Sequence, residues 1–102
     1  MSTVELGGDL GIESTTELKN RLAPLVEQAG ELTLDASQVA RIHTAAVQVL
    51  CAFVQARREA GLGTGFHGCT ATFSDAARLL GVTQALGLDV THDILKSVEN
   101  AA

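Results

Sequence analysis

The stretch from residue 32 to residue 50 constrains the fold of this chain most, because its hydrophobic spacing changes there from that of a strand to that of a helix. Residues 32–34, Leu-Thr-Leu, have the apolar and β-branched character of a short buried strand. The sequence Asp-Ala-Ser at 35–37 breaks this strand, and a helical pattern of apolar residues begins after Thr44. The sequence therefore predicts a strand, a loop and a helix in close succession.

Thr44 stands where this helix is expected to begin. We expect it to be the N-cap, because a threonine oxygen can accept a hydrogen bond from a free backbone N–H of the first turn. A helix N-terminus also favours an anion, including a phosphate carried on the hydroxyl. Two interpretations of Thr44 follow: a plain N-cap, or a phosphoacceptor that controls binding, since phosphorylation adds a charge of about −1.5 to −2.

The helix predicted over residues 44–59 is unusually apolar. Its apolar stripe consists of Val47, Leu50, Cys51 and Val54, widened by Val49 and Phe53. Such a broad stripe predicts a helix packed between the sheet and another helix. Alternatively, part of it contacts a partner protein, and it would also allow a dimer.

The N-terminal third of the chain predicts two strands and a helix. Residues 3–6 and 10–12 flank a Gly-Gly-Asp turn and predict a possible hairpin. Ser14 and Glu17 have the spacing of a capping box at the start of a helix. Pro24 is expected to kink or split that helix, because proline has no N–H and clashes with the preceding turn.

The C-terminal part predicts one more strand and further helices. A glycine-rich turn at residues 61–65 leads into a strand at 65–69. Ser74 is expected to cap a short helix over residues 74–80, and residues 89–98 predict a last short helix before the chain end.

The alternation of strands and helices predicts one α/β domain over residues 1–102, with 89–102 as a C-terminal helix and tail. Parallel neighbours joined by right-handed crossovers are expected from this order. The expected architecture is a mixed sheet of four to five strands, with the helices packed mainly on one face.

Composition excludes several classes of protein. The net charge of −5 and the absence of Trp and Tyr argue against nucleic-acid binding. No apolar run approaches the roughly 20 residues of a membrane span, so direct membrane insertion is not expected. The N-terminus does not resemble a signal peptide, which predicts a cytoplasmic protein. Cys51 and Cys69 are expected to be reduced core residues rather than a disulfide or a metal pair.

The chemistry-bearing residues predict neither a catalytic nor a metal site. The histidines at 43, 67 and 92 have no local ligand spacing, and no Gly-x-Ser-x-Gly sequence is present. The glycine-rich turn at 61–65 follows a helix and lacks a lysine, which argues against a bound nucleotide. We therefore expect no enzymatic activity and no cofactor.

Two stretches carry a family resemblance. The first contains Leu34-Asp-Ala-Ser37 and Ile42-His-Thr-Ala-Ala-Val-Gln-Val-Leu50. The second runs from Phe73 to Leu88. In their order and spacing they resemble STAS domains, the family of bacterial anti-sigma factor antagonists. The resemblance covers roughly residues 3–88.

This resemblance implies a small α/β sandwich that acts as a non-enzymatic interaction module. In family members that regulate sigma factors, a kinase-like partner phosphorylates the Ser or Thr that follows a motif Asp, and phosphorylation releases the partner. That Ser or Thr falls on Thr44 here. The motif is degenerate, because His43 replaces its Asp and Ala46 replaces its Gly.

We therefore expect a bacterial signal-transduction protein that binds an anti-sigma factor with serine-kinase activity, or a similar partner, and whose phosphoacceptor is Thr44. The expected partner-binding residues are Ser37, Arg41, His43, Thr44, Ala45 and Gln48. Two alternatives stay open: a STAS subunit that binds the ATPase of a phospholipid-transport ABC complex, and an adaptor of a chemotaxis-type histidine kinase. The protein is expected to be a monomer or a weak homodimer.

Overall fold

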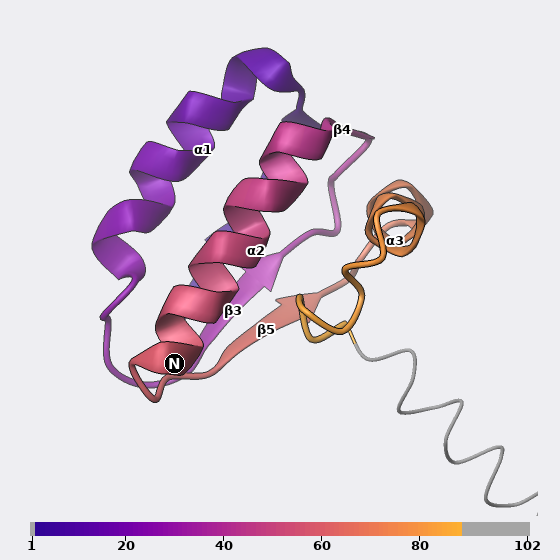
Figure 1. Cartoon of the computed structure of the whole chain (residues 1–102). Coiled ribbons are helices and arrows are strands. Elements are labelled where there is room, and N and C mark those ends of the chain that lie inside the picture. The colour runs from indigo at the N-terminus through magenta and orange to yellow at the C-terminus, as the bar shows by residue number, and fades with distance from the viewer. Residues whose placement is uncertain (1, 89–102) are drawn as a thin grey trace, which may run out of the picture.

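The computed structural model describes residues 2–88, in which strands and helices alternate as an α/β fold (Figure 1). The helix predicted over residues 89–98 lies outside the described residues. The elements are β1 (Ser2–Glu5), β2 (Asp9–Leu10), the 3₁₀ turn η1 (Ile12–Ser14), α1 (Thr15–Leu22), the 3₁₀ turn η2 (Ala23–Leu25), β3 (Leu32–Asp35), β4 (Arg41–Ile42), α2 (Thr44–Glu59), β5 (Thr64–His67) and α3 (Ala71–Leu79).

The central sheet has the order β1–β3–β5, and its pairings are parallel. Leu34 of β3 lies in register between Val4 and Phe66, and its side chain is completely buried. Parallel strands need crossover connections, which α1 and α2 supply. Both helices lie side by side on the same face of the sheet (Figure 1), as the sequence predicts.

The hairpin expected from residues 3–6 and 10–12 is wrong. After β1 ends at Glu5, the chain instead reaches Gly8, whose carbonyl accepts hydrogen bonds from the backbone N–H groups of Ala40 and Arg41. These bonds draw β2 to β4, and the two strands pair in parallel as a separate two-stranded sheet. The α/β fold is confirmed, but its five described strands are divided three and two and are paired in parallel, where a mixed sheet was expected.

The helix ends agree only in part with the sequence analysis. Pro24 does interrupt the first helix: α1 ends at Leu22, and Pro24 lies in η2. The capping box is wrong, because Ser14 has helical backbone angles at the end of η1 and its side chain forms no cap within the described part of the chain. The Ser74 cap is also wrong. Thr70 is the extended N-cap of α3, and its hydroxyl accepts from the N–H of Phe73.

Arg57, near the end of α2, is completely buried. A guanidinium group has five N–H donors, and all five are used here at distances of 2.8–3.0 Å. The acceptors are Thr64 Oγ1 and the carbonyl oxygens of Leu25, Gln28, Gly30 and Gly63. One side chain therefore joins the end of η2, the approach to β3 and the approach to β5.

Replacement of Arg57 tests this arrangement. We expect Arg57→Ala to lower the free energy of unfolding by about 3–5 kcal/mol, because it removes five part-buried hydrogen bonds and leaves a cavity where the side chain was. The matched control is Arg58→Ala, since Arg58 is exposed and makes one long hydrogen bond of 3.4 Å. Urea unfolding followed by circular dichroism should show a change within about 0.5 kcal/mol for the control. Equal effects of the two substitutions would contradict the role given to Arg57.

Gly68, just after β5, allows two loops to approach closely. Its φ is +67°, and a Cβ built there would lie 2.8 Å from the Cβ of Ser37. A side chain at this position would therefore meet both an unfavourable backbone conformation and a steric clash.

Comparison with a second glycine separates these two costs. Gly81 has a φ of +71°, with open space where a Cβ would lie. Gly81→Ala should cost about 1–2 kcal/mol from backbone strain alone. Gly68→Ala should cost roughly 1–3 kcal/mol more in urea unfolding, because of overpacking. Adding Ser37→Gly should recover most of the excess, and a failure to recover it would place the cost elsewhere.

A candidate partner-binding surface at the start of α2

The start of α2 is held in place by backbone hydrogen bonds to the neighbouring β2 strand. Leu10 of β2 pairs with Ile42 of β4, and its carbonyl accepts from the N–H of His43 at 2.9 Å. The loop before β4 is fixed to α3, because Thr70 Oγ1 donates to the carbonyl of Val39 at 2.6 Å. The first turn of α2 therefore projects from a braced loop.

His43, not Thr44, is the N-cap of α2, so this prediction is wrong by one residue. The backbone of His43 is extended, and its Nδ1 accepts a hydrogen bond from the N–H of Ala45 at 3.0 Å. Because the histidine ring provides the cap, Thr44 is the first helical residue and is exposed.

Substitutions at the two positions distinguish these roles. We expect His43→Ala to lower the free energy of unfolding by about 1 kcal/mol, because it removes the cap. His43→Asp should retain a cap and gain about 0.3–1 kcal/mol from the helix dipole. Thr44→Ala should change stability by less than about 0.5 kcal/mol in the same urea assay. A larger cost for Thr44→Ala than for His43→Ala would show that the cap is assigned to the wrong residue.

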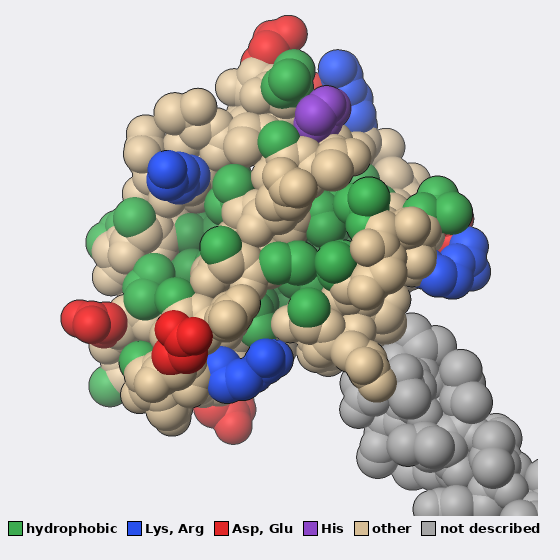
Figure 2. All heavy atoms as spheres, viewed as in Figure 1, with side chains coloured by type: hydrophobic (Ala, Val, Ile, Leu, Met, Phe, Trp, Pro, Cys, Tyr) green, Lys and Arg blue, Asp and Glu red, His purple; other side chains and the backbone are tan. Residues whose placement is uncertain are grey.

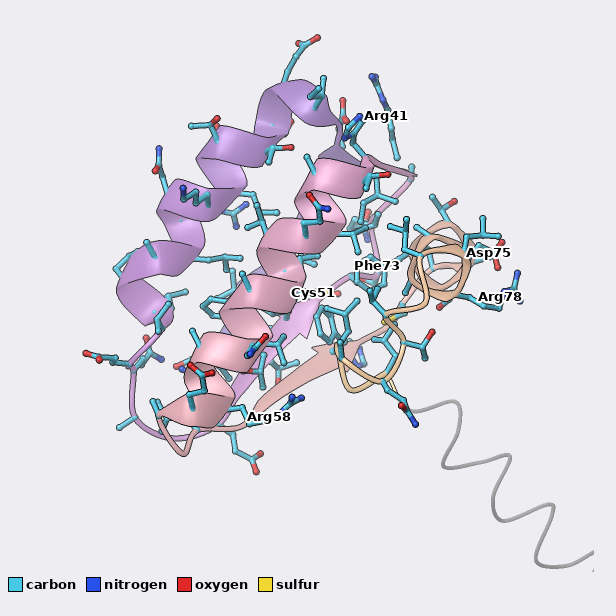
Figure 3. All side chains as sticks on the ribbon, viewed as in Figure 1. Arg41, Cys51, Arg58, Phe73, Asp75 and Arg78 are labelled. Carbon is cyan, nitrogen blue, oxygen red and sulfur yellow. The ribbon has the colours of Figure 1, made fainter. Side chains whose placement is uncertain are left out.

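Thr44 and Gln48 lie one turn apart on α2, and both are exposed. They border a depression of about 240 Å³ between α2 and the end of α3. Its remaining lining is apolar and consists of Val47, Cys51, Leu80 and Val82. Figure 2 shows hydrophobic side chains on this side of α2, and Figure 3 shows Cys51 projecting from the helix.

The sequence analysis placed Val47 and Cys51 in an apolar stripe that a partner could contact, but it missed the contribution of Leu80 and Val82 at the end of α3. Leu79 is 81% exposed and Leu80 is 42% exposed, although both continue the apolar pattern of the last helix. The available signal was helical spacing, because Phe73, Ala77 and Leu80 are four and three residues apart and share one face of the helix, which leaves Leu79 on another face. A partner that covered the depression would remove apolar surface from water.

Arg41 adds a positive charge near the first turn of α2 (Figure 3). In the β2–β4 pair it lies opposite Asp9, and its Nη1 is 3.8 Å from Asp9 Oδ2. Both side chains are well exposed, at 69% and 63%, so this ion pair is weak. The guanidinium group therefore remains available to an incoming anion.

Ser37 contacts a different group of residues from Thr44. Its backbone N–H donates to Asp35 Oδ1 at 2.9 Å, and its Cβ faces Gly68. Hydrogen bonds from the Ser37 hydroxyl and backbone lower the pKa of Asp35, and the charge of His67 adds to this effect. The structure thus gives Ser37 a defined role in the β3 loop. Its predicted part in partner binding stays a prediction.

We define the helix-start surface as the side chains of Arg41, His43, Thr44, Ala45 and Gln48. Four of them are exposed, and Ala45 is half-buried. Ala46, at the position of the family's motif glycine, is completely buried, so a larger side chain there would overpack the core.

The two cysteines are unpaired and partly buried, and burial raises the pKa of each thiol. Residues 2–88 contain no group of three or more His, Cys, Asp or Glu side chains arranged to hold a metal ion. Within the same residues, no helix has both the length and the apolar character needed to cross a membrane.

Comparison with known families agrees with this architecture. A family model described as "Mlab, STAS domain" matches residues 1–92. The chain therefore belongs to the STAS-domain family, and the resemblance predicted from its sequence is confirmed. Domains of this family generally bind protein partners and are generally non-enzymatic. A search of curated proteins found no match.

Proposed function

We propose that this STAS domain is a non-enzymatic regulator of the anti-sigma-antagonist kind, which binds a kinase-like or signalling partner through the helix-start surface. The observation that carries the proposal is the exposed Thr44 hydroxyl at the first position of α2, beside exposed Gln48 and an apolar depression. Membership of a family of protein-interaction modules supports it. We place this function in the cytoplasm of a bacterium.

Phosphorylation of Thr44 is the proposed control. A kinase would transfer the terminal phosphoryl group of ATP to Thr44 Oγ1, and the hydroxyl proton would be lost. The new negative charge is favourable within the chain, because it sits at the N-terminus of α2. Arg41 supports it from the adjoining strand, since its pairing with Asp9 is weak.

The same phosphate would oppose binding. A partner that covers the depression must also desolvate the groups at its border, and a phosphate with a charge of about −1.5 to −2 is costly to desolvate even beside Arg41. It also repels an acidic partner surface. Phosphorylation would therefore leave the protein folded and release the partner.

The identity of residue 43 favours a second candidate function. His43 stands where the family motif has an acidic residue, and its Nδ1 is used to cap α2. A kinase that recognises the acidic motif would meet a different side chain here. In this alternative, the protein is a constitutively bound subunit, such as one attached to the ATPase of a phospholipid-transport ABC complex or an adaptor of a histidine kinase, and Thr44 is never modified.

Binding and modification are best measured together. We expect Thr44→Glu to weaken co-purification of the partner at least about tenfold, because it places a charge at the border of the depression. Thr72→Glu is the matched control, since Thr72 is also an exposed threonine in the first turn of a helix, α3. It should bind as the unmodified protein does.

Intact-mass analysis of the protein from its own cells, with fragmentation, completes this test. One phosphate on Thr44 would support the regulated function. An unmodified chain under several growth conditions, with partner binding lost in Thr44→Glu, would support the constitutive subunit. Partner binding unchanged by Thr44→Glu would contradict both.

A further inference from the structure

A groove of about 630 Å³ lies between α1 and α2, on the face of the molecule that points away from the sheet. Its volume falls within the roughly 300–1,000 Å³ of sites that bind small molecules. Small side chains form much of its lining, including Ala45, Ala52 and Ala56 of α2. Figure 2 shows hydrophobic side chains along this side of α2.

The two ends of the groove differ in polarity. Both helices connect parallel strands on one face of the sheet, so they run in the same direction, and their first turns lie at the same end. The half of the groove nearer that end carries Thr16, Lys19 and Gln48, all exposed, with Lys19 in the last turn of α1. The other end is lined by Val26 and Ala56, among other apolar residues.

Lys19 is the one charged residue that lines the groove. It forms no ion pair with any residue from 2 to 88. The first turn of α2 contains no acidic residue and adds partial positive charge at the same end, whereas the first turn of α1 carries Glu17. The polar end of the groove is therefore suited to a single negative charge.

We propose that this groove binds an anionic amphiphile with an unbranched alkyl chain, such as a medium-chain carboxylate. The headgroup lies by Lys19, within reach of the Thr16 hydroxyl and the Gln48 amide. The alkyl chain runs toward Val26 and Ala56. From Ala45 to Ala56 the groove extends about 16 Å along α2, at about 1.5 Å per residue, which accommodates a medium-length chain.

The net negative charge of the protein helps to distinguish binding in the groove from non-specific binding. A chain with a net charge of −5 attracts cationic amphiphiles non-specifically. A preference for the anionic amphiphile must therefore come from a local site. Decanoate and decylamine provide the comparison, because they share a chain length and differ in headgroup charge.

The test is an NMR titration of ¹⁵N-labelled protein with each amphiphile, below the concentration at which it aggregates. Decanoate should shift the amide signals of α1 and α2 saturably and bind more tightly than decylamine. Lys19→Gln should lower the affinity for decanoate about threefold, as expected for the loss of an exposed charge pair. Lys19→Glu should reverse the preference. Arg78→Gln, which removes an exposed charge on α3, should change neither affinity.

Filling the groove provides a second variant. Ala52 is exposed and lines the groove, so Ala52→Trp should block the alkyl chain and leave the fold intact. The proposal is overturned if decylamine binds as well as decanoate, if Ala52→Trp binds normally, or if the shifts never saturate. It is also overturned if sedimentation shows a dimer whose contact covers the groove and excludes decanoate.

Discussion

The packing of this small protein depends on the buried guanidinium group of Arg57. Two stretches of chain meet at this point and present carbonyl groups that need donors: residues 25–30, which lead from η2 toward β3, and the turn at Gly63 before β5. A planar group with five donors satisfies them together, whereas a hydrophobic side chain would leave them unpaired. Its acceptors are all neutral, so the positive charge is stabilised by aligned carbonyl dipoles, among them those at the end of the first helical segment.

This anchor lies far from the helix-start surface. Arg57 and Thr44 are separated by about 20 Å along α2, at about 1.5 Å per residue. The two ends of the same helix therefore have different tasks. One end fixes the helix to the sheet, and the other presents an exposed hydroxyl on a loop held by hydrogen bonds to β2 and α3. A charge added at Thr44 can alter a contact with a partner without disturbing the buried network.

The sequence predicted the elements whose signal is local and missed those set by contacts between distant segments. The bounds of α2, the strand at Leu32 and the break at Pro24 follow from periodicity and from the chemistry of proline. The β2–β4 pair could not be predicted, because two residues are too few for a pattern. In the sequence, Arg57 belongs to a polar stretch at the end of the helix. Its burial was missed because its five acceptors come from other segments. At the candidate site, the change from strand to helix spacing and the motif led to Thr44, whose part in binding stays a prediction. The cap was assigned to Thr44 because histidine is not among the usual N-cap residues. The apolar depression could not be predicted, because it depends on where the end of α3 lies against α2.

The central claim is that the helix-start surface is where a partner protein binds. Site-specific photo-crosslinking in the protein's own cells tests it most directly. One photoreactive residue would replace Gln48, beside Thr44, and another would replace Glu27, an exposed residue beyond η2 near the anchored end of the fold. The account predicts one discrete crosslinked protein from position 48 and none from position 27. The same product from both positions, or a product from position 27 alone, would contradict it.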